Sequence, residues 1–446
     1  MADQSTTNRR SFTQATVAAA AATTMLRPAV HASAGEGPTG DRIRLGVIGV
    51  ANRGGQLVDA FQSHDDCRIT AICDVNLMAM KKMVQRVGNG VRLYSDFRQL
   101  IYSSDVDAVV IATPDHWHAL QTVIACYADK DVYVEKPLSV TVVEGRAMVD
   151  AARRNKRIVQ VGTHRRSSPL YRELAPRIQD GLLGHVCMSR CYRISNMAPS
   201  GIGKLTPVDP PSHLDWEMWL GPRAFQPYQS NIAPYKFRWW QNYSSQMGNW
   251  GVHYLDAIRW CTGDLAPSSV CAMGGRFAVA DDRTIPDTME VTFQFDSGRM
   301  VTFGQYETSG AAAIDGGEVE MRGTLGTALV NESSYEIRPE RGGQFQERQP
   351  RMKPETKELG TRNAALTALH ARNFLDCVRS RKTPNADVEI GHRSTTMSLI
   401  ANISHAVGRR LQWDASTEQF VNDAEANEML HYEYRDPWKG ILETPE

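Results

Sequence analysis

The sequence has no excess of either charge: its 446 residues include 50 Lys and Arg against 50 Asp and Glu. Proteins that bind nucleic acid or an anionic membrane surface usually carry a marked basic patch or net positive charge. The balance gives no such footprint, so we expect neither a nucleic-acid nor a membrane partner. A small neutral ligand fits the composition better.

Cysteine pairs with metal-binding spacing are also lacking. None of the eight cysteines forms a CxxC pair, and no residue near Cys187 and Cys191 completes a zinc site. We therefore expect buried free thiols, as in a protein that folds in a reducing compartment.

Long hydrophobic runs are absent, and the uncharged, Ala-rich stretch 13–26 is too short and too weakly apolar for a membrane span. It follows Asn8-Arg9-Arg10-Ser11-Phe12 and precedes Ala32-Ser33-Ala34. This arrangement resembles a twin-arginine export signal over residues 1–34, which implies a periplasmic protein exported in the folded state. A flexible leader that stays on the chain, or arms a neighbouring subunit, is the alternative.

The chain is too long for one ordinary core, so we expect two domains. Residues 41–162 are assigned to the first domain, 163–415 to a second, and 416–446 to a C-terminal tail.

The first domain opens as strand, turn, helix and strand. An apolar run over 43–49 leads into a glycine-bearing turn, a helical pattern follows over 55–63, and a second strand over 68–73 ends at Asp74. In such an arrangement the turn and the helix N-terminus bind a dinucleotide pyrophosphate. The turn residues expected to contact the cofactor are Gly49, Ala51, Asn52, Arg53 and Gly54. Ala51 stands where the usual fingerprint has its second glycine, and a turn without any nucleotide is the alternative.

Asp74 follows Gly54 by 20 residues, the spacing of an acid that accepts hydrogen bonds from the ribose hydroxyls. Such a carboxylate repels a 2′-phosphate, so NAD is favoured. Arg53 and Asn76 lie close enough in sequence to keep NADP possible.

Two further strands, 108–112 and 132–134, are each followed by a polar motif. Ligands sit beyond the carboxyl ends of parallel strands, so both motifs should reach the nicotinamide end of the cofactor. The residues expected there are Thr113, Pro114, His116, His118, Glu135, Lys136 and Pro137. His116 and His118 also have the spacing of a metal pair, but no third ligand follows, so no metal is expected.

The second domain carries alternating strand patterns at 186–194, 288–295 and 300–306, and a hairpin turn over 296–299 joins the last two. An open, mostly antiparallel sheet follows. Its open face predicts a homo-oligomer, a dimer or a tetramer.

The pattern predicts a helix that begins near Asn249 and runs to Trp260, with Asn249, His253 and Asp256 at i, i+4 and i+7 on one polar stripe. A lone helical histidine is more often structural, but three polar groups flanked by tryptophans favour a catalytic site.

These segments together resemble the Gfo/Idh/MocA oxidoreductase family over residues 41–410. The motifs are GVIGVANRG at 46–54, CDVN at 73–76, ATPDHWH at 112–118, EKP at 135–137, GTHRR at 162–166 and NWGVHYLD at 249–256. Segments 214–222, 237–251 and 370–394 resemble an exported subgroup from polysaccharide-degrading bacteria. The resemblance implies an N-terminal Rossmann domain, a C-terminal α/β domain with an open sheet, and NAD(P)-linked chemistry on sugars or cyclitols.

In this family an Asp commonly stands four residues before the histidine, where this chain has Asn249. The change removes a carboxylate expected to raise the pKa of His253 and hold its tautomer, and Asp256 is the expected substitute.

The expected reaction oxidises a secondary hydroxyl of a sugar, glycoside or cyclitol, with Lys136 or His253 as the base. Arg165, Arg166, Tyr243 and Trp250 are the expected substrate contacts. Free NAD is scarce outside the cytoplasm, so an exported enzyme should hold its cofactor tightly and recycle it. The alternatives are a redox-neutral glycoside cleavage by oxidation, elimination and reduction, and a non-catalytic sugar-binding protein.

Overall fold

The computed structural model describes residues 42–88, 90–360 and 363–442. The predicted export signal, residues 1–34, lies outside this range. Within the described residues, no helix combines the length and apolar character needed to cross a membrane.

The first domain is built on a sheet of parallel strands. These are β1 (Ile43–Ile48), β2 (Cys67–Cys73), β3 (Arg92–Tyr94), β4 (Ala108–Ile111), β5 (Asp131–Val134) and β6 (Val159–Val161). Their order is β3-β2-β1-β4-β5-β6, and every pairing is parallel. The inner strands β4 and β5 are buried along their whole length because helices cover both faces of the sheet, whereas the edge strand β3 is mostly exposed. The predicted Rossmann fold is confirmed.

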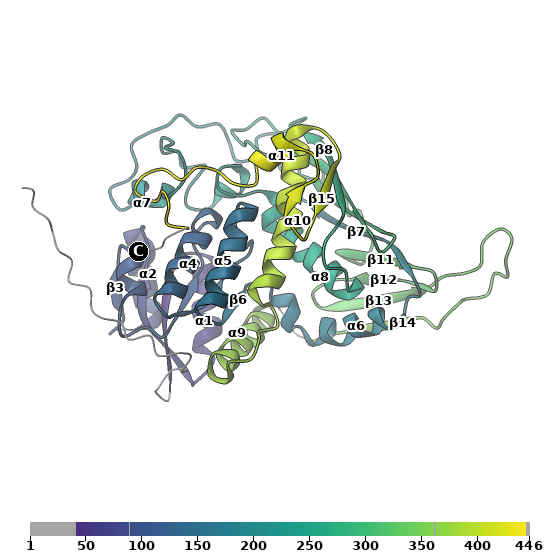
Figure 1. Ribbon diagram of the computed structural model, residues 1–446, viewed down its shortest axis with the longest axis horizontal. Coiled ribbons are helices and arrows are strands. Elements are labelled where there is room, and N and C mark those ends of the chain that lie inside the picture. Colours follow the sequence, from purple (N-terminus) through teal and green to yellow (C-terminus); the bar gives the residue numbers. More distant parts are fainter. Residues whose placement is uncertain (1–41, 89, 361–362, 443–446) are drawn as a thin grey trace, which may run out of the picture. The chain divides into compact units, whose positions relative to one another are not determined.

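The helices that connect these strands are α1 (Arg53–Gln62), α2 (Leu77–Val87), α3 (Phe97–Ile101), α4 (His118–Tyr127) and α5 (Val142–Arg154). α5 begins with a capping box: Thr141 and Glu144 satisfy each other's backbone N–H groups. α4 and α5 lie side by side on one face of the sheet (Figure 1).

The second sheet is larger and mostly antiparallel. Its strands are β7 (Val186–Ile194), β8 (Ser269–Gly275), β9 (Thr288–Phe295), β10 (Arg299–Tyr306), β11 (Val319–Gly323), β12 (Gly326–Val330), β13 (Ser334–Pro339), β14 (Glu355–Glu358), β15 (Leu411–Asp414) and β16 (Gln419–Phe420). Their order is β14-β13-β12-β11-β7-β10-β9-β8-β15-β16, and only β7 and β10 pair in parallel. The predicted open antiparallel sheet is confirmed.

Alternation along the strands explains which face of this sheet is buried. In β9, Val291 and Phe293 are fully buried, whereas Glu290 and Gln294 are exposed. The buried face packs on α6 (Pro169–Gln179), α8 (Val252–Thr262) and α10 (Val388–Val407). The opposite face leaves Met273 and Met300 exposed to solvent.

The predicted division at residue 162 separates the two sheets, but the packing does not follow chain order. α9 (Asn363–Ser380) lies against α1, and its Phe374 packs edge-to-face on Phe61 and Tyr133 of the first domain. α10 contacts both α5 and α8, so it lies between the domains (Figure 1). α9 completes this part of the core, because its Ala371, Phe374 and Leu375 are fully buried among residues of the first domain.

Residues 416–442 do not form a free tail. They include α11 (Ala424–Glu428), and Tyr434 and Trp438 are buried in the core of the first domain. Trp438 packs on Trp117 with ring centroids 4.9 Å apart. Aromatic side chains thus anchor a segment that the sequence assigned only to a C-terminal tail.

Residues 197–243 form a segment of little regular structure, which we call the cover segment. It has an aromatic core of its own, in which Trp216 stacks on Trp219 inside α7 (Trp216–Leu220). Backbone hydrogen bonds tie it to the first domain: Asp215 N donates to Val75 O at 3.0 Å, and Leu77 N donates to His213 O at 2.9 Å. The segment is therefore held at the carboxyl end of β2.

Candidate functional site

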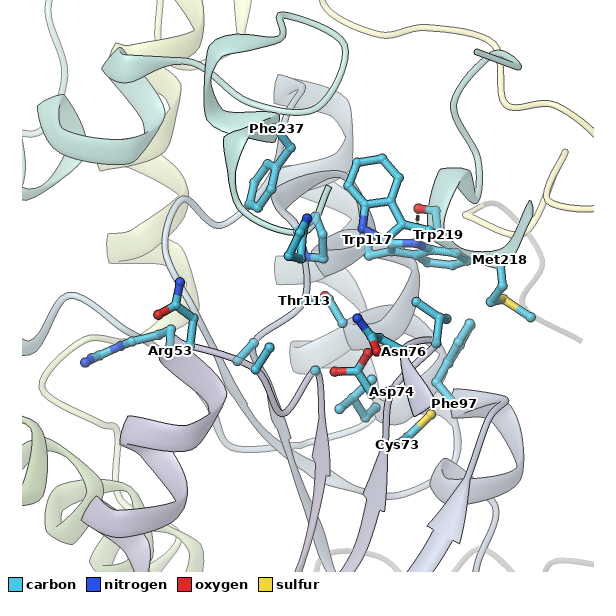
Figure 2. A pocket seen from close by; sticks show the side chains of 18 of the residues that line it. Arg53, Cys73, Asp74, Asn76, Phe97, Thr113, Trp117, Met218, Trp219 and Phe237 are labelled. Atoms are coloured by element: carbon cyan, nitrogen blue, oxygen red, sulfur yellow. Dashed lines mark hydrogen bonds between the residues drawn. The ribbon is translucent and has the colours of Figure 1, made fainter. Parts of the chain in front are cut away.

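A cleft opens at the carboxyl ends of the first sheet, beneath the cover segment. Of the residues predicted to bind a cofactor, the cleft is lined by Gly49, Ala51, Asn52, Arg53, Asp74, Thr113 and Pro114. Figure 2 shows Asp74 on the floor of the cleft and Trp219, Met218 and Phe237 above it. Strand ends thus form the floor, and the cover segment supplies the opposite wall.

The turn between β1 and α1 has the geometry that an anion needs. Gly49 has φ +80°, and a Cβ there would lie 2.7 Å from the Ala112 carbonyl oxygen. A Cβ on Gly54 would lie 1.9 Å from the Gly49 oxygen. Only glycine fits at either position, whereas Ala51 is exposed and its methyl group is tolerated. α1 begins at Arg53, and its N-cap residue Asn52 makes no side-chain capping hydrogen bond, so the first N–H groups of the helix suit a pyrophosphate.

The negative charge of Asp74 and the positive charge of Arg53 lie at different places along the cleft. Asp74 Oδ2 accepts from Val50 N at 2.9 Å and Oδ1 accepts from Asn76 N at 2.8 Å. Burial raises the pKa of Asp74, and these backbone hydrogen bonds oppose the change. Arg53 lies away from Asp74 (Figure 2) and pairs with Glu135 at 2.8 Å. Its guanidinium is therefore committed elsewhere, which leaves the carboxylate to face a ribose and fits NAD better than NADP.

A second cavity adjoins the first, and Arg53 lines both. It is lined by Glu135, Lys136, His164, Trp250, His253 and Glu332, among others. Lys136 follows β5 of the first domain and His253 lies on α8 of the second. The structure thus brings the two predicted proton-transfer residues into one cavity.

Lys136 is held by Asn249. Its Nζ donates to the Asn249 carbonyl oxygen at 2.7 Å and to Oδ1 at 3.1 Å. Asn249 lies in a π-helical turn, Met247–Gly251, that precedes α8, and such turns recur at functional sites. Burial lowers the pKa of Lys136 to about 8, although the Glu135 carboxylate acts in the opposite direction. A neutral amine is therefore accessible near physiological pH.

His253 is buried, and its Nδ1 has no hydrogen-bond partner among the described residues. Burial lowers its pKa well below the ordinary value, and the Lys136 cation lowers it further. The imidazole is thus neutral, and it lines the cavity.

His164 belongs to the same cavity and was not predicted. Its ring lies 5.4 Å from that of His253, and its Nε2 lies 3.2 Å from Glu332 Oε1. Burial lowers the pKa of His164, and the hydrogen bond with Glu332 opposes that shift. The signal was present in the sequence, because His164 follows soon after β6, which ends at Val161 and is the neighbour of β5 in the sheet.

Asp256 and Arg166 have a different role from the one predicted. Arg166 Nε lies 2.8 Å from Asp256 Oδ2, and Ser394 Oγ donates to Asp256 Oδ1 at 2.6 Å. Both residues are buried and neither lines the cavity. The three residues of the predicted polar stripe therefore do not act together, because Asp256 bonds to Arg166 instead of orienting His253. Arg166 in turn is not placed to touch a substrate.

Arg165 and Tyr243 are also structural. Arg165 is 2% exposed, and its Nη2 bonds to Glu318 at 2.6 Å and to Glu332 at 3.2 Å. Tyr243 is fully buried and packs on His116 and Trp219. Of the four predicted substrate contacts, only Trp250 lines the cavity.

His116 and His118 support the loops around the cleft without lining it. His116 Nε2 lies 2.9 Å from the Trp219 carbonyl oxygen, and the two nitrogens of His118 lie 2.7 Å from Pro137 O and 3.0 Å from Thr113 O. One ring nitrogen of His116 and both of His118 thus lie within hydrogen-bond distance of backbone carbonyl oxygens. The described residues contain no cluster of three or more His, Cys, Asp or Glu that could hold a metal ion.

Comparison with known proteins agrees with this geometry. Residues 43–163 match the Gfo/Idh/MocA model described as an oxidoreductase family with an NAD-binding Rossmann fold. Residues 178–335 and 340–440 match the C-terminal alpha/beta domain of that oxidoreductase family.

Several curated relatives match part of the chain. The rhizopine catabolism protein MocA of Rhizobium meliloti is 30% identical over 37% of this chain and 51% of its own length. Glycosyl hydrolase family 109 protein 2 of a Shewanella species is 34% identical over 34% of this chain and 38% of its own. The inositol 2-dehydrogenase of Azotobacter vinelandii is 32% identical over 33% and 45%. The chain thus spans about half or less of the length of these relatives.

Solved structures share the fold at low identity. A levoglucosan dehydrogenase in complex with NADH superposes with a TM-score of 0.66 at 17% identity, over 83% of this chain and 99% of that one. The WlbA dehydrogenase of Bordetella pertussis, in complex with NADH and UDP-GlcNAcA, gives 0.63 at 19% identity, over 84% and 99%. Since the family models cover nearly the whole described chain and the dinucleotide cleft is intact, this protein belongs to the Gfo/Idh/MocA family of NAD-binding oxidoreductases.

Proposed function

We propose that the protein oxidises a secondary hydroxyl of a sugar, glycoside or cyclitol, with NAD as the cofactor. The observation that carries the proposal is the joint placement of Lys136 and His253 in one cavity beside the dinucleotide cleft. The inositol dehydrogenase among the relatives supports the substrate class. Bound nicotinamide supplies the hydride acceptor, and the chain must position the alcohol and remove its proton.

The cavity contains the groups that this task requires. Lys136, with a pKa of about 8, can accept a hydroxyl proton in its neutral form. His253 lines the cavity as a neutral imidazole, Trp250 offers an apolar face for a sugar ring, and Glu332 offers a carboxylate that can accept hydrogen bonds from hydroxyl groups. These groups come from both domains, so a substrate must bind between them.

The cover segment supports tight retention of the cofactor. Met218, Trp219 and Phe237 line the dinucleotide cleft opposite the turn, and Trp219 is nearly fully buried. An enzyme that holds its cofactor must regenerate it in the same site. Either a second sugar is reduced there, or one substrate is oxidised and reduced in turn.

The second of these routes is a redox-neutral glycoside cleavage, and His164 favours it. Oxidation by NAD next to a C–H bond acidifies that bond, and elimination then expels the aglycone and leaves a double bond. Water adds across this double bond, and the NADH formed in the first step reduces the ketone back to the alcohol. This sequence needs more proton transfers than simple oxidation, and the cavity holds His164 in addition to Lys136 and His253. The glycosyl hydrolase family 109 relative supports this candidate.

Export and self-association complete the proposal. Residues 1–34 suggest the twin-arginine route to the periplasm, and lysine in place of Arg9 and Arg10 should retain the protein in the cytoplasm on cell fractionation. The exposed face of the second sheet suggests a homo-oligomer.

Denaturing mass spectrometry of the purified protein tests the cofactor first, because it reveals whether NAD(H) copurifies. The protein is then incubated with inositols, free sugars and p-nitrophenyl glycosides, while NADH absorbance and nitrophenol release are followed. Net NADH formation supports the dehydrogenase. Nitrophenol release without net NADH supports the redox-neutral route, and His164→Asn should then slow release more than it slows NADH formation in a single turnover. No dinucleotide and no turnover with any probe would contradict both candidates.

A further inference from the structure

Lys136 stands at one end of a buried chain of hydrogen bonds. Asn249 Oδ1 accepts from Lys136 at 3.1 Å, and Asn249 Nδ2 donates to Gln246 Oε1 at 3.2 Å. Gln246 Nε2 in turn donates to Glu307 Oε1 at 2.9 Å. Gln246 and Glu307 are each 1% exposed, so water cannot substitute for these contacts.

The far end of this chain is anchored by an ion-pair cluster. Arg283 bonds to Glu307, and its Nε lies 2.9 Å from Asp281 Oδ1. Trp239 of the cover segment also donates from Nε1 to Glu307 Oε1 at 3.0 Å. Arginine and the indole N–H can only donate, so both carboxylate oxygens of Glu307 act as acceptors.

The two ends fix the direction of every bond between them. A lysine ammonium only donates and a carboxylate only accepts. The amide of Gln246 must therefore turn its NH₂ group to Glu307 and its oxygen to Asn249. Asn249 must then turn its NH₂ group to Gln246 and its oxygen to Lys136.

We propose that Glu307 and Gln246 are positioning residues that present a neutral oxygen, Asn249 Oδ1, to Lys136. The same direction of bonds makes asparagine the residue that fits at position 249, where the family commonly has Asp. A carboxylate at 249 would face the Gln246 oxygen. If the Gln246 amide turned over, its oxygen would instead face the Glu307 carboxylate, and the repulsion would arise there.

The neutral oxygen of Asn249 affects how readily Lys136 loses its proton. A neutral acceptor orients the ammonium without adding a negative charge, so the amine loses its proton more easily than it would beside a carboxylate. Glu135, Asp115, Arg53 and Arg238 also act on Lys136 electrostatically and stay unchanged in the variants below. Any change in its titration then reports on position 249.

A double-mutant cycle tests the direction of the bonds in the full-length protein. Asn249→Asp should lower the urea midpoint, and Glu307→Gln should restore much of that loss, because a glutamine at 307 can donate to the Gln246 oxygen and reverse the chain. Additive effects of the two substitutions would overturn the proposal.

Glu307→Gln also breaks the ion pair with Arg283 and can itself unfold the protein. Gln246→Met supplies a second background: it removes the amide that imposes the direction, so Asn249→Asp should cost less there than in the wild type. Gln305→Met is the matched control. Gln305 is equally buried, but it bonds to Pro286 O at 2.7 Å and is not part of the chain of hydrogen bonds between Lys136 and Glu307. It should leave the cost of Asn249→Asp unchanged. An equal cost in all three backgrounds contradicts the proposal.

The titration of Lys136 is read independently of activity. Competitive labelling with trace acetic anhydride across pH, quantified by mass spectrometry, reports the pKa of individual lysines in the folded protein. Asn249→Asp should raise the pKa of Lys136 by about one to three units, and an unchanged pKa refutes the role of the neutral oxygen. The proposal uses Lys136 as the proton-transfer group of the proposed function. Because neither readout needs a substrate, loss of that function would leave this result standing, and the reverse holds as well.

Discussion

Asn249 bonds to Lys136 and not to His253 among the described contacts, with its backbone and side-chain oxygens 2.7 and 3.1 Å from the lysine Nζ. The resemblance to the family led us to expect that the exchange of Asp for Asn would act on the histidine. In the structure it acts on the lysine, and burial together with the Lys136 cation keeps His253 neutral. Asn249 therefore positions Lys136 and does not position His253.

Lys136→Ala and His253→Ala should each reduce turnover by about a hundredfold to ten-thousandfold, the usual contribution of a positioned acid or base. The double variant should be little worse than the poorer single variant, because the two groups act on the same substrate oxygen. Steady-state kinetics measures this, and mass spectrometry checks that NAD remains bound. Multiplicative losses would show that the two residues act at separate steps.

Turnover should increase with pH through about pH 8, because the pKa of Lys136 is lowered to about that value and only the neutral amine accepts a proton. Asn249→Asp should move the rise to higher pH. The measurement is kcat against pH for the oxidation step. A profile that is flat from pH 7 to pH 9 would argue that Lys136 is not the base.

Asp74→Ala should relax the preference for NAD over NADP. The variant loses the acceptor for the ribose hydroxyls and the negative charge that repels a 2′-phosphate. Titration calorimetry on cofactor-free protein gives the ratio of the two dissociation constants. An unchanged ratio would mean that the adenosine end lies elsewhere in the cleft.

Asp256→Asn should destabilise the fold by about 3–5 kcal/mol, because it leaves Arg166 buried beside a neutral group. Asp256 is 1% exposed, and it holds both Arg166 and Ser394. Urea unfolding measures the loss. The folded fraction should keep near-normal kcat, and a large loss of kcat with normal stability would restore the catalytic role first assigned to it.

Static light scattering on the mature protein should give a mass of two or four chains at micromolar concentration. Met273 on β8 and Met300 on β10 are 75% and 46% exposed on the outer face of the second sheet. A lysine at both positions should shift the protein toward monomer, whereas lysine at Phe345, in the distant loop between β13 and β14, should not. A single-chain mass for the wild type would leave that face without a partner.

Local patterns predicted most of the first domain. The turn, Asp74 and the strand ends at Thr113 and Glu135 are encoded within short windows, and the parallel sheet places them at one edge by rule. In the second sheet, β7, β9 and β10 also followed from alternation, whereas the other strands were not predicted. The two sheets and the cofactor cleft were therefore accessible from the sequence alone.

Long-range pairing decided what the patterns left open. Asp256, Arg165, Arg166 and Tyr243 carry the groups of a binding site, but their partners lie on segments distant in sequence and bury them. His164 carried no local signal beyond its position after a strand. The part played by Glu307 depends on two amides in between, which no periodicity reveals.

The cover segment couples cofactor release to its own local stability. Trp219 and Phe237 belong to the core that holds this segment together, and they also form a wall of the dinucleotide cleft. The cleft can open widely only if that aromatic core separates from the sheet below. The contacts that stabilise residues 197–243 locally thus also contribute to the free energy of cofactor binding. Any substitution that loosens the tryptophans should speed NAD release, even at a position that never touches the nucleotide.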